Sequence, residues 1–207
     1  MMEACRIPML PPGPQKATSL RNLENILDGY IATADPPLSQ LVPELMAMYP
    51  DAKVLCTMRD SESWVRSIMD IVRATQPTLA SFLFFWIPST RWLPKAGRAM
   101  EDLFAYRFGA RIRDEVSARQ IWEKHHAWLE EIVPKEKLFF VDVKDGWGPI
   151  CKALDLEVPD VPFPRLNDVG EVEEHFRKQA IKGLQRWAMF FGAVAGVVGV
   201  GWWYWKR

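Results

Sequence analysis

An arginine and a serine eight positions apart are the residues of this sequence best suited to bind an anion. Arg59 follows the apolar run KVLCTM (53–58), and Ser67 lies in the segment after it. The run predicts a strand, and the segment predicts a helix to about Thr75 with Asp60 as its N-cap. A planar guanidinium and a hydroxyl beyond the end of a strand can together bind a phosphate group.

The surroundings of Arg59 support two interpretations. In the first, Arg59 binds an anion beside the positive N-terminal end of the helix, because parallel sheets bind ligands at the carboxyl ends of their strands. In the second, Arg59 forms a surface ion pair with Asp60 or Glu62, and Ser67 is hydrated. The residue types alone leave both interpretations open.

Strands and helices that would hold this site alternate along the chain. KLFFVDV (137–143) predicts a second strand, and YIATA (30–34) a short third one. Helices are expected over 19–29, 38–50 and 110–133, and within GPICKALDL (148–156). Because helical segments separate the strands, the fold class is α/β, a parallel sheet flanked by helices. The unbroken apolarity of the two longer runs predicts that both strands are buried.

Composition narrows the classes of partner and ligand. Lys plus Arg and Asp plus Glu number 26 each in 207 residues, so no global field attracts nucleic acid and no such partner is expected. Cys5, Cys56 and Cys151 are widely spaced and form no CxxC pair. This spacing predicts free thiols in a reducing compartment and argues against a disulfide scaffold or a metal site.

The segment from Trp187 to Trp205, WAMFFGAVAGVVGVGWWYW, is nineteen residues long and carries no charge. As a helix it would be about 28 Å long, close to the thickness of a bilayer's hydrocarbon layer. A buried core helix is the other interpretation, but four glycines and an aromatic end suit a soluble core poorly. The sequence therefore predicts a single-pass C-terminal anchor in a lipid bilayer.

Charges and glycines near this span predict its orientation and a pairing face. Basic residues before the span outnumber those after it, which places the globular part in the cytoplasm. The preceding ones are Arg177, Lys178, Lys182 and Arg186, and only Lys206 and Arg207 follow. Gly192 and Gly196 form a GxxxG pattern, which predicts helix–helix pairing in the membrane.

Two further features have a structural interpretation. The apolar part of LASFLFFWIPSTRWL (79–93) is too short to span a membrane, so we expect a core helix or a substrate-covering flap rather than membrane contact. His125 and His126 are adjacent on an expected helix. Neighbouring helical residues point apart, so this pair lacks a metal-ligand spacing and structural packing is favoured.

Three stretches resemble the fungal sulfotransferase-like family of the P-loop containing nucleoside triphosphate hydrolase superfamily. They are GYIATADPP (29–37), YPDAKVLCTMRDSESWVRS (49–67) and a long segment over 122–168, in the family's order and spacing. The resemblance implies a parallel sheet that binds 3′-phosphoadenosine 5′-phosphosulfate as co-substrate, without a metal. It also implies that the sulfuryl acceptor is a hydroxyl or amine of a small molecule.

The same resemblance implies roles for three residues. Arg59 and Ser67 match the positions that bind the 3′-phosphate of the co-substrate. Asp35, ahead of Pro36-Pro37, matches a catalytic base that takes the proton from the acceptor. A turn aspartate before proline is the other interpretation of Asp35, since such turns are common.

The sequence departs from the family near its N-terminus. The family's phosphate loop, roughly G-x-G-R-T-G-T-x-S-L, is not found, and GPQKATSL (13–20) lacks its glycine pattern. No G-x-x-x-x-G-K-[ST] motif occurs either. The expected fold is therefore an N-terminally truncated sulfotransferase-like one, with a C-terminal transmembrane helix.

Four segments are expected along the chain. Residues 1–18 contain four prolines and no apolar stretch typical of a secretory signal, so an irregular segment is predicted. A sulfotransferase-like domain follows over 19–168, then an amphipathic linker helix over 169–186 and the membrane helix over 187–205. Two functions fit this organisation: a membrane-anchored sulfotransferase, active or inactive in this form, and a non-catalytic tail-anchored interaction protein on the same fold.

Overall fold

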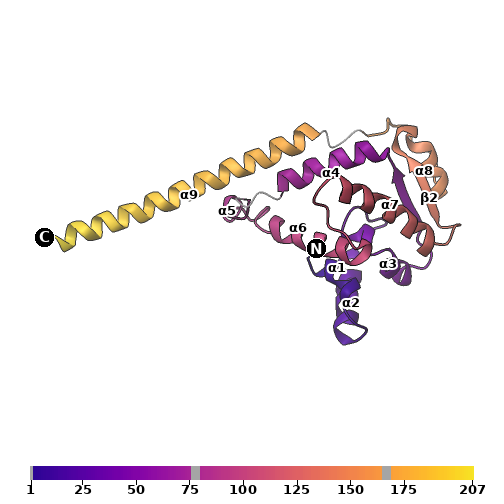
Figure 1. Cartoon of the computed structure of the whole chain (residues 1–207), viewed down its shortest axis with the longest axis horizontal. Coiled ribbons are helices and arrows are strands. Elements are labelled where there is room, and N and C mark those ends of the chain that lie inside the picture. The colour runs from indigo at the N-terminus through magenta and orange to yellow at the C-terminus, as the bar shows by residue number, and fades with distance from the viewer. Residues whose placement is uncertain (1, 76–79, 165–168) are drawn as a thin grey trace. The chain divides into compact units, whose positions relative to one another are not determined.

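The computed structural model describes residues 2–75, 80–164 and 169–207. The chain divides into two compact units (Figure 1). The first combines Met1–Val72 with Ala96–Arg165, and the second combines Arg73–Lys95 with Leu166–Arg207.

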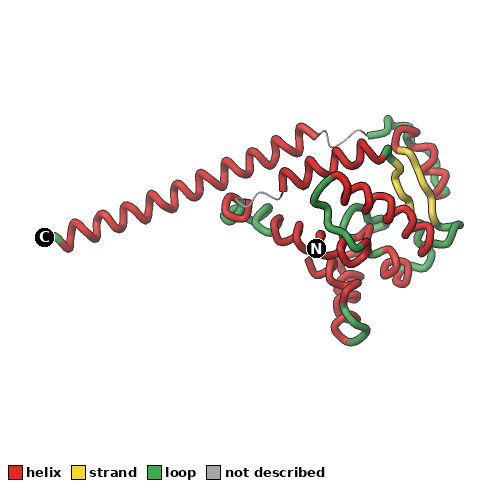
Figure 2. Tube along the Cα trace, viewed as in Figure 1, coloured by secondary structure: helices red, strands yellow, loops and turns green. Residues whose placement is uncertain are grey.

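The first unit contains a parallel sheet of two strands, β1 (Val54–Met58) and β2 (Leu138–Asp142), drawn in yellow in Figure 2. Val54 pairs with Leu138, and Met58 pairs with Asp142. Both strands and their parallel direction confirm the α/β prediction. Their burial is less complete than expected, because Phe140 is 40% exposed. In a two-stranded sheet each strand has one open edge with no neighbouring strand, so side chains along that edge, such as Phe140, stay partly exposed to solvent.

Two helices cover one face of this sheet. The helices are α3 (Val42–Met48) and α7 (Glu115–Ile132). Val42, Cys56, Leu129 and Val133 form a buried cluster, which Met46, Val54, Met58, Trp128, Ile132 and Leu138 extend. On the other side of the strand pair, α8 (Trp147–Leu154) contacts β2 (Figure 1). Burial of the Cys56 thiol raises its pKa to about 11, so this cysteine is a packing residue at neutral pH.

A second cluster holds α4 (Ser61–Thr75) and the end of α6 (Leu93–Phe108) against α7. Its buried members are Val65, Met69, Phe108, Ile112, Ala118 and Ile121. The start of α7 is defined by a capping box, in which the Asp114 carboxylate accepts the Ser117 backbone N–H at 2.8 Å. These contacts attach α4, the helix that carries Ser67, firmly to the core.

The N-terminal region is helical where the prolines predicted an irregular segment. It consists of α1 (Met2–Arg6), the 3₁₀ helix η1 (Ile7–Met9) and α2 (Pro14–Leu27). Pro8 and Pro14 lie in the first turns of η1 and α2. At those positions proline is favourable, because the missing N–H has no partner within a helix. Ile7, Leu23 and Leu41 then bury this region against the start of α3.

The chain between α2 and α3 differs from its prediction. Residues 30–34, expected as a strand, form no regular structure and are exposed. The helix expected over 38–50 is divided into the 3₁₀ helix η2 (Leu38–Gln40) and α3. Without a neighbouring strand, the apolar run YIATA has no ladder of hydrogen bonds to join, and it remains a connection.

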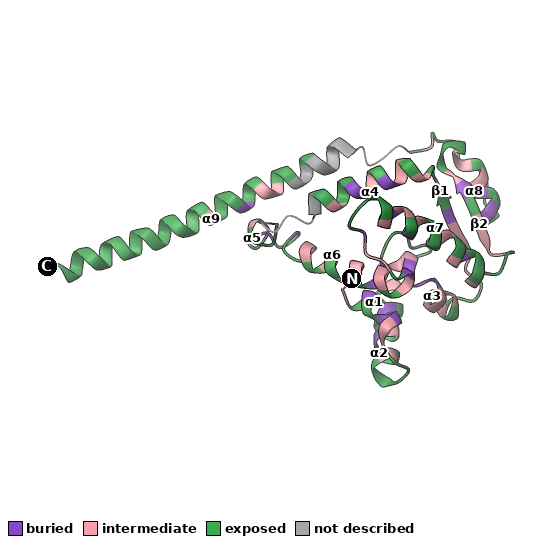
Figure 3. Ribbon diagram, viewed as in Figure 1, coloured by how far each residue is buried: buried purple, intermediate pink, exposed green. Residues whose placement is uncertain are grey.

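The second unit contains α5 (Ala80–Leu83) and α9 (Val169–Trp205), a helix of 37 residues. The expected linker and membrane helices are therefore one continuous helix. Among the described residues, one helical segment, Arg177–Trp205, has the length and apolarity to cross a membrane, and its most apolar part has no buried residue. Figure 3 shows this exposure along the C-terminal half of α9. A core helix of a soluble protein would instead be mostly covered.

Candidate functional site

The candidate site begins where the two strands end. Met58 and Asp142 are paired in register, so Arg59 and Val143 both leave the same edge of the sheet. The Asp142 carboxylate accepts the backbone N–H of Lys144 at 2.9 Å and so caps a short turn. Arg59 is therefore an exposed cation at the carboxyl edge, the place where parallel sheets bind their ligands.

The N-terminus of α4 is already occupied by a carboxylate. Asp60 accepts the backbone N–H of Ser63 at 2.9 Å and that of Glu62 at 3.2 Å. Hydrogen bonds from Ser63, and after them the bond from Glu62, lower the pKa of Asp60. The predicted cap is confirmed. Asp60 takes two of the N–H groups at this end of the helix and adds a negative charge, so these two groups are not available to an anion.

Glu62, the other carboxylate that could neutralise Arg59, also has another partner. It forms an ion pair with Arg119 of α7, which lowers the pKa of Glu62 and raises that of Arg119. Among the described residues, the Arg59 guanidinium has no hydrogen bond or ion pair. The interpretation of Arg59 as half of a surface ion pair with Asp60 or Glu62 is therefore wrong.

Ser67 is half-buried in the second turn of α4, between the core residues Val65 and Met69. Its hydroxyl makes no hydrogen bond to any residue that the structure describes. One turn earlier, the Ser63 hydroxyl accepts a hydrogen bond from Arg66 at 3.0 Å. The segment thus contains two arginine–serine combinations. Arg66 and Ser63 are hydrogen-bonded to each other, whereas Arg59 and Ser67 are not.

Asp35 occupies an exposed turn ahead of η2. Its backbone is left-handed (φ 60°), a conformation that aspartate tolerates, and its carbonyl accepts the Ser39 N–H at 3.1 Å. Within the described ranges, no hydrogen bond or ion pair connects Asp35 to the Arg59–Ser67 segment. The local structure is that of a turn, and the predicted role as catalytic base remains a prediction.

His125 and His126 lie among aromatic rings on α7. His125 packs against Phe108 and Trp128, with ring centroids 5.8 Å away in each case. Burial, together with the neighbouring His126, lowers the pKa of His125 to about 4, so it is neutral at pH 7. The Trp122 carbonyl lies 2.7 Å from Nδ1 of His126. Within the described part of the chain, no group of three or more His, Cys, Asp or Glu side chains could hold a metal ion.

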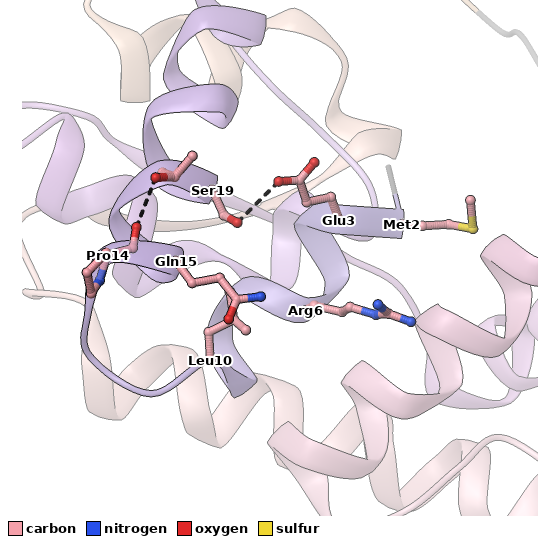
Figure 4. Close-up of a pocket in the computed structure, with 8 residues that line it drawn as sticks. Met2, Glu3, Arg6, Leu10, Pro14, Gln15 and Ser19 are labelled. Carbon is pink, nitrogen blue, oxygen red and sulfur yellow. Dashed lines mark hydrogen bonds between the residues drawn. The ribbon is translucent and has the colours of Figure 1, made fainter.

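An open cavity of about 630 Å³ lies among α1, η1 and α2 (Figure 4). It is lined by Met2, Glu3, Arg6, Leu10, Pro14, Gln15, Thr18 and Ser19. The Ser19 hydroxyl donates to the Glu3 carboxylate at 3.2 Å. No motif in the sequence predicted a cavity here, because its lining depends on how α1 folds against α2. It involves neither β1 nor α4, and Glu3 and Arg6 place one charge of each sign in its lining.

Comparisons with known proteins agree with this architecture. Residues 3–172 match a family described as the sulfotransferase domain. The chain is also similar to "Ava biosynthesis cluster protein M" of Aspergillus versicolor, at 29% identity over 194 residues, which is 90% of this chain and 74% of that protein. The family match begins ahead of GPQKATSL, and the missing phosphate loop remains a prediction. Since the match includes both strands, α4 and far more than half of the 207 residues, the chain belongs to the sulfotransferase domain family.

Proposed function

We propose that this protein binds the 3′-phosphate of 3′-phosphoadenosine 5′-phosphosulfate through Arg59 and Ser67. The observation that carries the proposal is the unpaired Arg59 guanidinium at the carboxyl edge of the sheet. Asp60 caps α4 and Glu62 pairs with Arg119, so neither neutralises Arg59. A guanidinium that keeps its full charge and donors suits a phosphate dianion, and the Ser67 hydroxyl adds one donor.

The co-substrate would supply the sulfuryl group for transfer to a hydroxyl or amine of a small molecule. The residues described above fit one phosphate group of this co-substrate. In the proposed reaction, Asp35 takes the proton from the acceptor oxygen or nitrogen as that atom forms its bond to sulfur and the bond from sulfur to the 5′-phosphate oxygen breaks, which releases adenosine 3′,5′-bisphosphate. A small-molecule acceptor is supported by the family and by the relative's name, which refers to a biosynthesis cluster.

We further propose that α9 anchors the protein in a membrane through Trp187 to Trp205, with the globular part in the cytoplasm. Support comes from the exposed apolar helix and from the basic residues before it. Gly192 and Gly196 have open space where a Cβ would be, so a second helix can approach their backbone closely. We expect helix pairing at this face.

A non-catalytic, tail-anchored interaction protein on the same fold is the alternative function. It is favoured by the exposed turn position of Asp35 and by the lack of a glycine-rich phosphate-loop motif in the sequence. Such a loop stabilises the departing phosphate with its backbone N–H groups. We therefore expect this chain to bind the nucleotide while turnover stays undetectable.

Calorimetry with two nucleotides tests the phosphate site. Adenosine 3′,5′-bisphosphate should bind about tenfold or more tightly than adenosine 5′-monophosphate, because a charge-assisted contact contributes roughly 1.5–3 kcal/mol. Arg59→Ala should remove most of this preference, and Ser67→Ala should reduce it. Arg66→Ala is the matched control, since Arg66 is an exposed arginine of the same segment bonded to Ser63.

A sulfate-transfer assay on the same preparation separates the two functions. Equal affinity for the two nucleotides would exclude the Arg59–Ser67 site and favour the interaction protein. A preference without transfer would support a binding site in an inactive chain. Transfer that is lost in Asp35→Asn, with nucleotide binding unchanged, would support the enzyme and the proposed base.

A further inference from the structure

The segment over residues 81–92 packs directly on α9. Gly183 makes this contact possible, because a Cβ at that position would lie 1.8 Å from the Leu83 carbonyl oxygen. One turn further along α9, the Trp187 indole N–H donates to the Phe82 carbonyl at 2.7 Å. Arg186 donates to the Trp86 carbonyl. The backbone of the segment is therefore attached to the helix just where the uncharged stretch of α9 begins.

Six aromatic side chains surround this junction, and we call them the aromatic collar. They are Phe82, Phe85, Trp86, Trp187, Phe190 and Phe191. Phe82 stacks on Trp187 with ring centroids 4.2 Å apart, and Trp86 lies 5.5 Å from Phe190. Beneath the collar, Phe84 and Ile87 form a small buried cluster with Ala180.

The collar is packed but not covered. Phe85 is 57% exposed and Phe191 is 55% exposed. A soluble protein buries large aromatic rings or scatters them singly, whereas a contiguous exposed group marks a surface that contacts something else. The exposed apolar surface continues without interruption from the collar along α9, since every residue over 188–205 is exposed.

A second aromatic group lies at the far end of α9. Trp202, Trp203, Tyr204 and Trp205 are all exposed there. Trp187 and Trp203 are sixteen positions apart, about 24 Å along a helix, and small or aliphatic residues dominate the stretch between Phe191 and Trp202. Two aromatic belts at this separation are typical of the two interfaces of a bilayer.

Cations lie over a tryptophan ring of the 81–92 segment and over another at the far end of α9. Arg91 and Lys95 lie over the Trp92 ring, 5.1 and 4.9 Å from its centroid. At the far end, Arg207 lies 3.7 Å from the Trp203 ring centroid. Tryptophan with nearby Arg or Lys suits a headgroup layer, where the ring reaches apolar chains and the cation reaches phosphate.

We propose that residues 81–92 are a second membrane contact. The segment lies in the headgroup layer, and its rings in the aromatic collar complete the aromatic belt at the start of the anchor. This inference rests on the proposed anchoring by α9. The segment was expected to be a core helix or a flap rather than a membrane contact because its apolar part is too short to span a bilayer, but a segment of this length can lie in the interface. α5 and the turn after it can lie in the headgroup layer without spanning the membrane themselves, because hydrogen bonds from α9 hold their backbone.

The test uses the full-length protein in vesicles of phosphatidylcholine and phosphatidylserine, labelled with an environment-sensitive fluorophore on single introduced cysteines. Phe85→Cys and Trp92→Cys report on the segment, and both positions are exposed, so labelling should preserve the fold. Val197→Cys reports on the span, and Arg177→Cys, ten positions before Trp187, is the aqueous reference. Cys5, Cys56 and Cys151 are buried, so the parent protein serves as the labelling blank.

We expect blue-shifted emission at Phe85→Cys and Trp92→Cys, with stronger quenching by shallow than by deep nitroxide lipids. Val197→Cys should be quenched more by the deep nitroxide, and Arg177→Cys should emit as in water. Water-like emission at positions 85 and 92 with deep quenching at 197 would overturn this inference and leave the anchor intact. Water-like emission at all four positions would overturn both the inference and the anchoring.

Discussion

Glu44 of α3 and Arg107 of α6 are joined by two hydrogen bonds, of 2.8 and 3.0 Å, between the carboxylate and a single guanidinium nitrogen. The Glu44 side chain is 12% exposed and that of Arg107 is 14% exposed. Arg107 also donates to the Gln40 carbonyl at 3.0 Å and lies 5.3 Å from the Trp128 ring. This pair and its contacts connect four elements, α3, α6, η2 and α7.

Glu44→Ala should destabilise the protein by about 3 kcal/mol, because it leaves the Arg107 charge buried without its partner. Chemical denaturation of the full-length protein in detergent measures this loss. Arg119→Ala, which breaks the exposed pair with Glu62, is the control and should not move the midpoint measurably. A double variant, Glu44→Leu with Arg107→Met, should recover much of the stability, since no charge then remains buried. Equal stability of Glu44→Ala and the parent would show that the pair contributes nothing.

His125 should make stability depend on pH between about 6.5 and 4. Its pKa is about 4 in the folded protein and near 6.5 in the unfolded chain, so the unfolded state binds more protons in this range. Stability from this group is complete above pH 6.5 and decreases as the pH falls. The total loss is on the order of 3 kcal/mol. Urea midpoints at pH 7.5 and 4.5 measure it, and His125→Phe should flatten the difference. An unchanged pH dependence in His125→Phe would contradict the assignment.

Asp60→Asn should strengthen nucleotide binding if Arg59 and Ser67 hold a phosphate. Asparagine still caps α4 through its side-chain oxygen, but the negative charge beside the site is gone. Exposed charge interactions of this kind correspond to a gain of roughly two- to fivefold in affinity. Calorimetry with adenosine 3′,5′-bisphosphate measures the change. Asp114→Asn, at the N-cap of α7, is the matched control and should leave affinity unaltered. Weaker binding by Asp60→Asn would place the nucleotide elsewhere.

Residues 187–205 should hold the full-length chain in membranes through carbonate extraction. A version ending at Gln185 should be released into the soluble fraction, because it lacks the apolar stretch of α9 whose residues over 188–205 are all exposed. Protease treatment of sealed membranes checks orientation, and the globular part should be accessible from the cytoplasmic side. Recovery of the intact chain in the soluble fraction would contradict the anchor.

The local sequence pattern was sufficient to predict two strands, one helix cap and the apolar part of the C-terminal helix. Apolar runs identified β1 and β2, because a strand between two layers of helices needs continuous apolar side chains. Asp60 was recognisable as an N-cap from its place before the periodic segment. The length of uncharged sequence after Arg186 was enough to single out the C-terminal part of α9. Each of these features is marked by a pattern within about twenty residues, although β1 and β2 form only by pairing with each other across the chain.

The tertiary structure determines which charged side chains pair with one another and which remain available to bind a ligand. Asp60 and Glu62 were both possible partners for Arg59, and only the fold brings Arg119 of α7 to Glu62. It likewise joins Glu44 to Arg107, 63 residues away, and Phe82 to Trp187, 105 residues away. It also covers the apolar side of α1 and α2, so that a proline-rich region forms helices. These outcomes depend on contacts between residues far apart in sequence, whose geometry is fixed by packing of the whole unit and not by any local periodicity.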